Sequence, residues 1–232
     1  MSENLESLEE TFAAIAHQWR QPLNEINSLV GSIDNRLYAK DIKDADIEEE
    51  LLKIERLTRQ MSQSIDDFRN YFKKEQNQGN YPLDTLFKEI SDEYRELFAS
   101  LGIRLELMLE ESLTFHKERA LLKQIIATLL NNAKDALLAR SVYEAKVDIV
   151  VAKEEEFLLI DVKDNAGGIT KSAAARLFDA DFSTKHSSEG SGMGLYMVKK
   201  LLHEKFCGDI DVKNIEKGAS FCLKLPLNKE CE

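Results

Sequence analysis

The sequence predicts an α+β chain in which an N-terminal helical hairpin is followed by an α/β sandwich. Over about the first seventy residues, apolar positions recur every three or four residues, which is the period of an amphipathic helix. Beyond about residue 100, short segments alternate apolar and polar side chains, and longer helical segments lie between them. This mixture is expected of a sheet that is covered by helices.

Length and charge narrow the classes of protein that the chain can belong to. Its 232 residues suffice for a small domain beside an ordinary one with a sizeable core. The formal net charge of -11 argues against a nucleic-acid partner, because no basic patch offers a footprint for a phosphate backbone. No apolar run approaches the ~18 residues of a membrane span, so we expect no membrane contact by this chain and a cytoplasmic location. Three cysteines without a paired metal spacing favour free thiols over disulfides or zinc.

The first helix is predicted over residues 1–38 and carries His17 in the segment TFAAIAHQWRQPLNE. His17 falls five residues after Phe12 and two before Trp19, so at 100° per residue it points away from the apolar stripe and into solvent. Pro22 has no N–H to give the carbonyl of Gln18, so we expect it to interrupt and kink the helix. The predicted core-facing line of the stripe consists of Leu5, Phe12, Trp19, Ile26 and Ile33. A lone surface histidine on such a helix carries no function by itself.

A second helix is predicted over residues 47–72, with a matching stripe of apolar residues. Two helices cannot cover both stripes, so we expect a second copy of the chain to complete a four-helix bundle. The alternative is that the stripes pack on the C-terminal domain. The stretch KKEQNQGN has no apolar residue and has the composition of a linker. We therefore divide the chain into a dimerisation hairpin at residues 1–75, a linker at residues 76–81 and a C-terminal domain at residues 82–232.

The C-terminal domain reads as a mixed sheet of about five strands with three helices on one face. Strands are predicted at residues 103–109, 147–151, 158–162, 210–212 and 221–225, and helices at residues 82–100, 117–140, 173–178 and 193–205. The helix from residue 117 contains KQIIATLLNNAKDAL, where Thr128, Asn132 and Asp135 share one face. An amide oxygen on a helix is a suitable hard ligand for Mg²⁺, and either Asn131 or Asn132 fits on spacing alone. We favour a solvent-facing role for Asn131.

Two glycine-containing segments follow. In DNAGGI, a carboxylate at the end of a strand precedes two glycines, and Asp164 can accept a hydrogen bond from an adenine amine while the glycines admit the base. Taken alone, such a turn is more often structural than functional. The second segment places Gly190, Gly192 and Gly194 directly before a helix whose N-terminus can face phosphates, with Lys185 as the cation within reach. Its spacing matches neither a Walker loop nor a dinucleotide fingerprint.

Together these segments resemble, in order and distance, the N, G1, F and G2 boxes of the ATP-binding domain of histidine kinases, gyrase-type topoisomerases, 90-kilodalton heat-shock chaperones and mismatch-repair ATPases. His17 followed by Gln-Pro-Leu-Asn at residues 21–24 resembles the phosphoacceptor box of two-component sensor histidine kinases. The resemblance implies that Asn132 binds Mg²⁺, Asp164 binds adenine and Gly168 meets the edge of the base. It implies that the phosphates and the rest of the nucleotide are bound by Asp135, Lys185, Gly190, Gly192, Gly194 and Leu195. Phe178 and Phe182 would anchor the lid, with core burial as the alternative.

Three positions depart from the usual pattern of the family. Gln18 stands where most histidine kinases have an acidic residue, but a neutral imidazole is already nucleophilic at one nitrogen, so Gln18 need only hold the other N–H. Gln21 stands where the family often has the residue for hydrolysing aspartyl phosphate, so phosphatase activity stays open. Thr128 stands where the gyrase and chaperone branches have a glutamate that activates water, and threonine is a poor general base.

The resemblance therefore implies ATP-dependent autophosphorylation on His17 and transfer of the phosphoryl group to an aspartate of a response regulator. ATP and Mg²⁺ are the implied cofactors, and the implied partners are a second copy of the chain, a response regulator receiver domain and a separate sensor protein. One alternative is a kinase-impaired phosphatase or ATP-binding interaction module for a response regulator, which Gln18 favours. An ATP-driven clamp is the other, which Thr128 disfavours.

Overall fold

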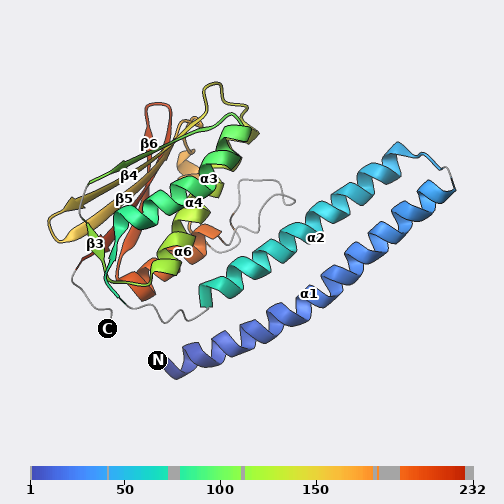
Figure 1. Ribbon diagram of the computed structural model, residues 1–232, viewed down its shortest axis with the longest axis horizontal. Coiled ribbons are helices and arrows are strands. Elements are labelled where there is room, and N and C mark those ends of the chain that lie inside the picture. Colours follow the sequence, from blue (N-terminus) through green and yellow to red (C-terminus); the bar gives the residue numbers. More distant parts are fainter. Residues whose placement is uncertain are drawn as a thin grey trace. The chain divides into compact units, whose positions relative to one another are not determined.

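The computed structural model describes residues 2–40, 42–72, 79–110, 113–179, 182 and 194–227. In the first two helices, side chains are described only for residues 19, 22–40, 42–58, 61 and 62. The chain divides into two compact units, one containing the two N-terminal helices and one containing the sheet and its helices (Figure 1).

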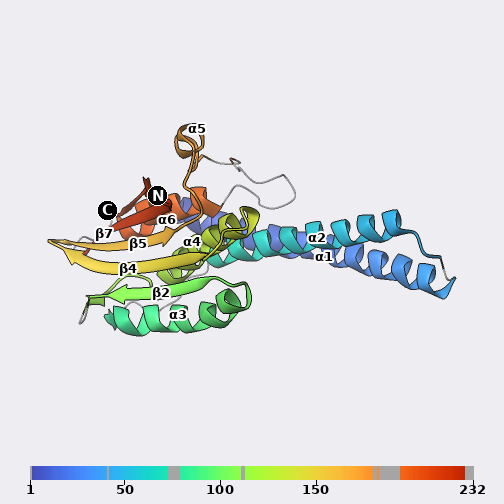
Figure 2. The same ribbon diagram turned by 90° about the horizontal axis from the view of Figure 1, so that it is seen from above.

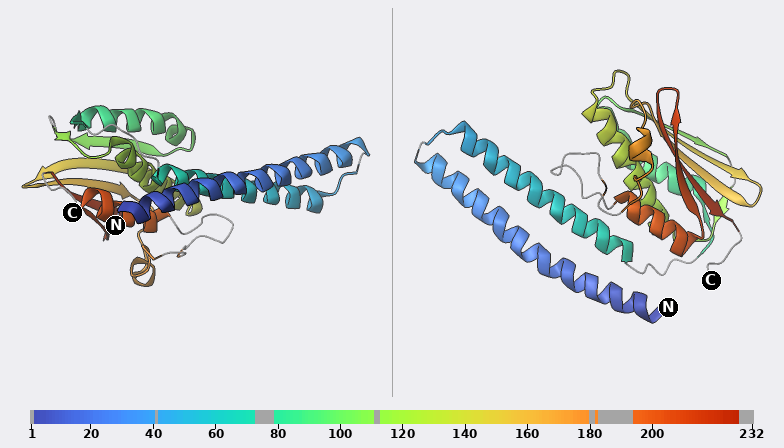
Figure 3. Two further views of the ribbon diagram at one scale, coloured as in Figure 1. Left: turned by 90° about the horizontal axis from the view of Figure 1, so that it is seen from below. Right: turned by 180° about the vertical axis from the view of Figure 1, so that it is seen from behind.

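The N-terminal unit is a hairpin of two long helices, α1 (Ser2–Ala39) and α2 (Ala45–Phe72) (Figure 3). The carboxylate of Asp44 caps α2, since its Oδ1 accepts hydrogen bonds from the N–H groups of Asp46 (3.1 Å) and Ile47 (3.2 Å). The expected interruption at Pro22 is wrong, because α1 continues through the proline as one helix. A long helix tolerates one missing hydrogen bond when flanking turns and packing against a neighbouring helix hold it.

Among the described side chains of the hairpin, one seam is covered within a single chain. Leu23, Val30 and Leu51 are buried there, and so is Thr58, whose hydroxyl bonds the side-chain oxygen of Asn27 across the seam. Other large apolar side chains are between 36% and 63% exposed, namely Trp19, Ile26, Leu29, Ile33, Leu52, Ile54, Leu57 and Met61. The predicted core-facing line thus remains open at Trp19, Ile26 and Ile33, while the flank of the stripe at Leu23 and Val30 is buried.

The second unit contains a five-stranded mixed sheet in the order β2-β4-β5-β7-β6. These strands are β2 (Arg104–Leu109), β4 (Lys146–Glu154), β5 (Phe157–Asp164), β6 (Asp209–Ile215) and β7 (Gly218–Pro226). The β2 and β4 strands pair in parallel, and the other neighbours are antiparallel. The predicted mixed sheet of about five strands is confirmed.

The short strands β1 (Tyr81–Pro82) and β3 (Thr114–Phe115) form a separate antiparallel pair, which the sequence did not predict. Tyr81, expected at the end of the linker, pairs with Phe115 and is itself buried. Helix α3 (Leu83–Ser100) follows directly, with Pro82 as its N-cap residue. The two-residue strands thus fix where the first helix of this unit begins.

Three helices cover one face of the sheet, as predicted: α3, α4 (Arg119–Ala139) and α6 (Gly194–Phe206) (Figure 2). The core between the layers is apolar and closely packed, and Phe87, Phe98, Leu122 and Phe206 are 0% exposed. The short helix α5 (Lys171–Ala174) follows β5, where a longer helix was expected.

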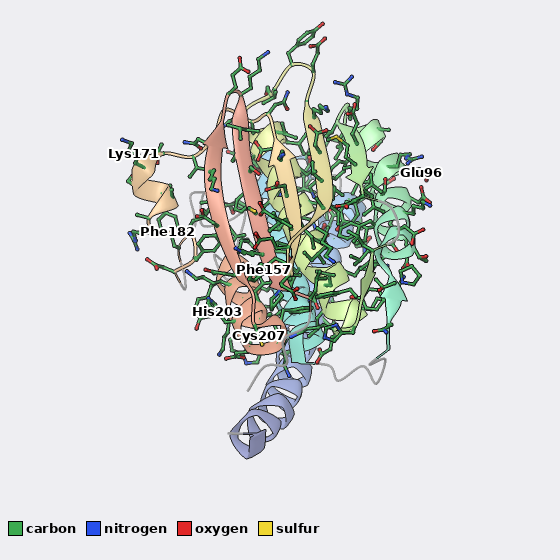
Figure 4. All side chains as sticks on the ribbon, turned by 90° about the vertical axis from the view of Figure 1, so that its left-hand side faces the viewer. Glu96, Phe157, Lys171, Phe182, His203 and Cys207 are labelled. Carbon is green, nitrogen blue, oxygen red and sulfur yellow. The ribbon has the colours of Figure 1, made fainter. Side chains whose placement is uncertain are left out.

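The other face of the sheet is lined mainly by charged side chains, and Figure 4 shows it from that side. The ammonium group of Lys146 lies 3.0 Å from a carboxylate oxygen of both Glu106 and Asp148. Near the opposite end, the ammonium group of Lys224 lies 4.1 Å from the centre of the Phe157 ring. This face is therefore a solvated one, and the core lies on the helical side.

Two further predictions can be compared with the fold. Cys222 is a free thiol, and burial followed by the neighbouring charge of Asp161 raises its pKa to about 11. Cys207 is disulfide-bonded, so the expectation of free thiols is wrong for that residue. Among the described residues, no helix is long and apolar enough to cross a membrane.

Candidate functional site

Asp164 is the last residue of β5, so its carboxylate lies at the end of the central strand of the sheet. The residue is only 6% exposed. Its Oδ1 accepts hydrogen bonds from the N–H groups of Ala166 (2.8 Å) and Ala219 (3.4 Å). Both bonds go to Oδ1, and within the described part of the chain Oδ2 accepts none. Burial raises the pKa of Asp164, while the two N–H groups and the charge of Arg140 oppose that rise. The result is a fixed carboxylate with one oxygen left for a donor such as an amine.

The turn after Asp164 depends on glycines at two kinds of position. Gly167 and Gly168 have φ values of +85° and +78°, a region that other residues rarely adopt. Gly218, at the start of β7, is needed for a close approach, because a Cβ built there would lie 1.8 Å from the carbonyl oxygen of Asp164. The carboxylate is therefore held by the backbone of the turn after β5 and by the backbone of β7.

Three polar side chains hold the same turn, and each makes two hydrogen bonds. One nitrogen of Arg140, Nη1, donates to the carbonyl oxygens of Ala166 and, at 2.9 Å, Gly168. Asn214 on β6 binds both the N–H and the carbonyl of Ile169, each at 2.8 Å. Asn165 joins the turn to the segment before β4, accepting from the N–H of Lys146 (2.8 Å) and donating to the carbonyl of Glu144 (3.0 Å).

Helix α4 carries the second group of candidate residues. Asn131 is already occupied, because its amide donates to the Tyr94 hydroxyl (3.2 Å) and its oxygen accepts from Lys134 (3.3 Å). It is half-buried, in contrast to the solvent-facing position expected of it. Asn132 is also half-buried, and its side chain makes no hydrogen bond to another described residue. Asp135 lies near Lys134, with 3.5 Å between charged atoms. Asn132 is thus the amide better placed to meet a ligand.

The start of α6 lies against α4. A Cβ built at Gly194 would lie 3.3 Å from the methyl carbon of Thr128, so a larger residue would push the two helices apart. The N-terminus of this 13-residue helix, with Leu195 as its second residue, therefore lies beside the face of α4 that carries Thr128. A helix N-terminus attracts anions through its free N–H groups. Lys185, Gly190 and Gly192 lie outside the described residues.

The aromatic residues expected to anchor the lid are each covered by a cation. Arg176 lies 4.8 Å from the ring centre of Phe182, and Lys199 of α6 lies 5.2 Å from that of Phe178. Neither ring is buried in the core, so the alternative of core burial is wrong for both. Figure 4 labels Phe182 beside α5, at the edge of the domain.

The candidate residues of the hairpin belong to the other unit. His17, Gln18 and Gln21 lie on α1, but their side chains are outside the described ones. The sequence reasoning missed Arg140, Asn165, Asn214 and Gly218, which hold the turn around Asp164. Only Asn165 had a local signal, as an asparagine inside the DNAGGI segment.

A comparison with known protein families assigns about half of the chain to a class of protein. Residues 117–229 match the family described as histidine kinase-, DNA gyrase B-, and HSP90-like ATPase. This segment contains α4, the Asp164 turn and α6, so the family match covers all the candidate residues of the second unit. Residues 117–229 therefore form an ATPase domain of this family.

Similarity to individual proteins extends over the hairpin as well. The signal transduction histidine-protein kinase AtoS of Escherichia coli is 27% identical over 241 residues, covering 99% of this chain and 36% of AtoS. The autoinducer 2 sensor kinase/phosphatase LuxQ of Vibrio vulnificus is 28% identical over 240 residues, covering 95% of this chain and 27% of LuxQ. The two-component sensor PprA of Pseudomonas aeruginosa is 33% identical over 114 residues, 48% of this chain and 12% of PprA. The chain thus spans between 12% and 36% of the length of these three relatives.

Solved structures agree on the fold. The full-length histidine kinase ShkA in complex with AMPPNP has a TM-score of 0.68 at 19% identity, covering 96% of this chain and 47% of that one. Histidine kinase ThkA in complex with the response regulator protein TrrA has a TM-score of 0.63 at 20% identity, covering 98% and 64%. With the family match, these similarities support the expected resemblance to the transmitter core of a sensor histidine kinase.

Proposed function

We propose that the chain is an ATP-dependent protein-histidine kinase that phosphorylates itself on His17 and passes the phosphoryl group to an aspartate of a response regulator. The ATPase family of residues 117–229 and the names of the relatives support the kinase activity. The AMPPNP bound by ShkA supports ATP as the nucleotide, and the complex of ThkA with TrrA supports a response regulator as the partner.

The geometry of the ATPase domain suits an adenine nucleotide. Oδ2 of Asp164 accepts a hydrogen bond from the adenine amine, because the backbone N–H groups bind the other oxygen, and Gly168 lies at the edge of the base. The N-terminus of α6 suits the phosphates, and the resemblance adds Lys185, Gly190 and Gly192 to the residues that bind them. The amide of Asn132 fits Mg²⁺, a hard cation that takes oxygen ligands, and Asp135 lies one turn further along α4. When bound, Mg²⁺ neutralises part of the phosphate charge.

One observation favours a kinase over an enzyme that hydrolyses ATP with water. The hydroxyl of Thr128 donates to the carbonyl of Gln124 at 3.0 Å, so the residue in this position neither carries a carboxylate nor offers a free base. A nucleophile is then better supplied by a side chain than by an activated water. A ring nitrogen of His17 attacks the γ-phosphorus, the bond from that phosphorus to the β-phosphate oxygen breaks, and ADP leaves.

We propose the same division of labour as the sequence suggested. The hairpin at residues 1–75 dimerises and presents His17, residues 76–81 connect, and residues 82–232 bind ATP. The exposed apolar side chains of α1 and α2 support a second copy of the chain as the partner that covers them. We place the protein in the cytoplasm, where a response regulator and ATP are both available.

A second candidate function is a phosphatase or interaction module with an impaired kinase step. Gln18 favours it, because most of the family has an acidic residue after the phosphoacceptor. LuxQ, one of the relatives, is named both a sensor kinase and a phosphatase. In this case Gln21 would position the water that hydrolyses the aspartyl phosphate of the partner.

Incubation with Mg²⁺ and ATP labelled in its γ-phosphate tests the proposal, with His17→Ala alongside. We expect the wild-type chain to retain label that is lost in acid and stable in base, and His17→Ala to retain none. Nucleotide binding without retained label would contradict the kinase reading and favour the phosphatase. Label that persists in His17→Ala would place the acceptor elsewhere.

A further inference from the structure

Arg140 is an exposed residue that holds the turn after Asp164. It is the C-cap of α4, the residue directly after the helix, and its two side-chain hydrogen bonds go to the carbonyls of Ala166 and Gly168. A Cβ built at Gly167 would lie 3.1 Å from the same nitrogen, so this end of the guanidinium group lies close to the turn at Gly167 as well. Burial in the core does not explain this residue, because it is exposed.

Asn214 holds the same turn from a different element. It is exposed on β6, and its amide pairs with both backbone groups of Ile169. The Gly168 position is close to it, since a Cβ built there would lie 2.8 Å from the side-chain oxygen of Asn214. The turn is thus held by two side chains that are distant in the sequence. Arg140 lies 28 residues before Gly168, and Asn214 lies 45 residues after Ile169.

We propose that Arg140 and Asn214 are positioning residues that set Asp164 and Gly168 for recognition of adenine. This inference rests on the proposed ATP site and assigns two residues to it. Without these two side chains, four backbone groups of the turn could rotate toward water, namely the carbonyls of Ala166, Gly168 and Ile169 and the N–H of Ile169. The glycines at 167 and 168 would not prevent that rotation, because glycine allows many backbone conformations. Holding the turn in advance removes an ordering cost from nucleotide binding.

Arg140 also links the two ends of the nucleotide site. It lies eight residues after Asn132 on a nearly continuous helix, which corresponds to about 12 Å along the axis at the rise of an α-helix. One rigid element therefore carries both the amide proposed for the metal and the cation that holds the base-binding turn. A shift of the turn relative to α4 would change the distance between the base and phosphate ends of the site.

The test compares four variants by calorimetric titration with ADP and with GDP in the presence of Mg²⁺. Arg140→Met keeps the length of the side chain and loses both donors, and we expect ADP affinity to fall about tenfold while GDP affinity hardly changes. Arg140→Lys should stay within about threefold of wild type, because both bonds come from one nitrogen and an ammonium group can reproduce them. Asn214→Ala should also lose about tenfold for ADP.

The matched control is Arg104→Met, which removes an exposed arginine on β2 that pairs with Glu106 at 3.3 Å. It should bind both nucleotides as the wild type does. The inference is overturned if Arg140→Met binds ADP as tightly as wild type, or if Arg140→Lys loses as much affinity and thermal stability as Arg140→Met. A wild-type chain that binds no ADP would instead overturn the proposed ATP site, and this inference with it.

Discussion

The two units of the chain use apolar side chains in opposite ways. In the ATPase domain, residues such as Leu122 on α4 and Phe206 on α6 are 0% exposed, because sheet and helices enclose them from both sides. In the hairpin, Leu29 and Leu52 are 63% and 59% exposed, although the helices are just as amphipathic. Two helices have one mutual seam, whereas a sheet and three helices form a closed layer. The ATPase domain completes its own core, and the hairpin needs another surface.

The largest expected effect comes from truncating a leucine to alanine in each unit, which tests whether the core of the ATPase domain is closed and the surface of the hairpin is open. Leu122→Ala leaves a cavity in a closed core, and we expect the free energy of unfolding of the ATPase domain to fall by about 2–5 kcal/mol in urea titrations. Leu52→Ala, the matched change on the exposed side of α2, should cost less than about 0.5 kcal/mol at protein concentrations where the chain is monomeric. Equal losses in the two variants would show that the hairpin has a closed core of its own.

A charge placed among the exposed apolar side chains of α1 tests whether a second copy of the chain covers them. Ile26→Lys places an ammonium group in the surface that a second copy would cover, and each substitution occurs twice in a symmetric dimer. We expect the dimer dissociation constant from sedimentation equilibrium to rise about 100-fold or more. Tyr38→Lys, at a position that is 89% exposed, should leave it unchanged. A wild-type chain that stays monomeric at high concentration would exclude dimerisation through this face.

Asp164, the residue proposed to bind adenine, is a carboxylate whose burial in the closed domain disfavours its ionised form. Its raised pKa means that the folded chain holds this proton more tightly than the unfolded one, so wild-type stability falls as pH rises through that pKa. Asp164→Asn removes this effect and still accepts the two N–H bonds through its amide oxygen. We expect its melting temperature at pH 7 to equal or exceed that of wild type, with the difference shrinking in acid.

The same substitution should cost ADP affinity about 30-fold in calorimetric titration, because it replaces a charged acceptor with an amide. Asp148→Asn, on the solvated face of the sheet, is the control and should bind normally. If Asp164→Asn lost stability and affinity together, the carboxylate would be structural.

The smallest expected effect concerns ion pairs between α3 and α4. Hydrogen bonds from Lys123 and then Arg119 lower the pKa of Glu89 to about 2. Ionised Glu89 therefore stabilises the domain above its unfolded pKa of about 4.3, and this contribution is lost as pH falls toward 2. Compared with Glu89→Gln, the wild type should be more stable at pH 7 by less than about 1 kcal/mol, since the carboxylate is 38% exposed.

Unfolding curves at pH 7 and in acid check this prediction, with Glu96→Gln on the same helix as the control for lost charge. A stability difference that stays constant down to pH 2 would contradict it.

Most of the secondary structure followed from local patterns. The predicted strand at 158–162 lies within β5, and the predicted helix at 193–205 agrees closely with α6, because alternation and helical period are properties of neighbouring residues. The pair β1 and β3 was missed, since two residues carry no period and the pairing joins positions more than thirty residues apart. Pro22 was expected to interrupt and kink the helix predicted over residues 1–38. Helix α1 instead continues through it, because the rest of the helix outweighs one missing hydrogen bond.

The candidate site divides in the same way. Asp164, Gly168 and Gly194 stand in short motifs whose residue types suggest their chemistry, so the sequence alone pointed to them. Arg140 and Asn214 stand in no motif, and they meet the turn only because α4 ends and β6 passes beside it.

By itself the sequence determined the fold class, the order of the elements and the motifs of an ATP-binding domain, because these depend on residue type and spacing along the chain. Only the tertiary structure decided which flank of the α1 stripe is buried, and which distant side chains hold the turn after Asp164. Hydrogen bonds and packing contacts join residues through space, and a single sequence does not record which distant residues become neighbours.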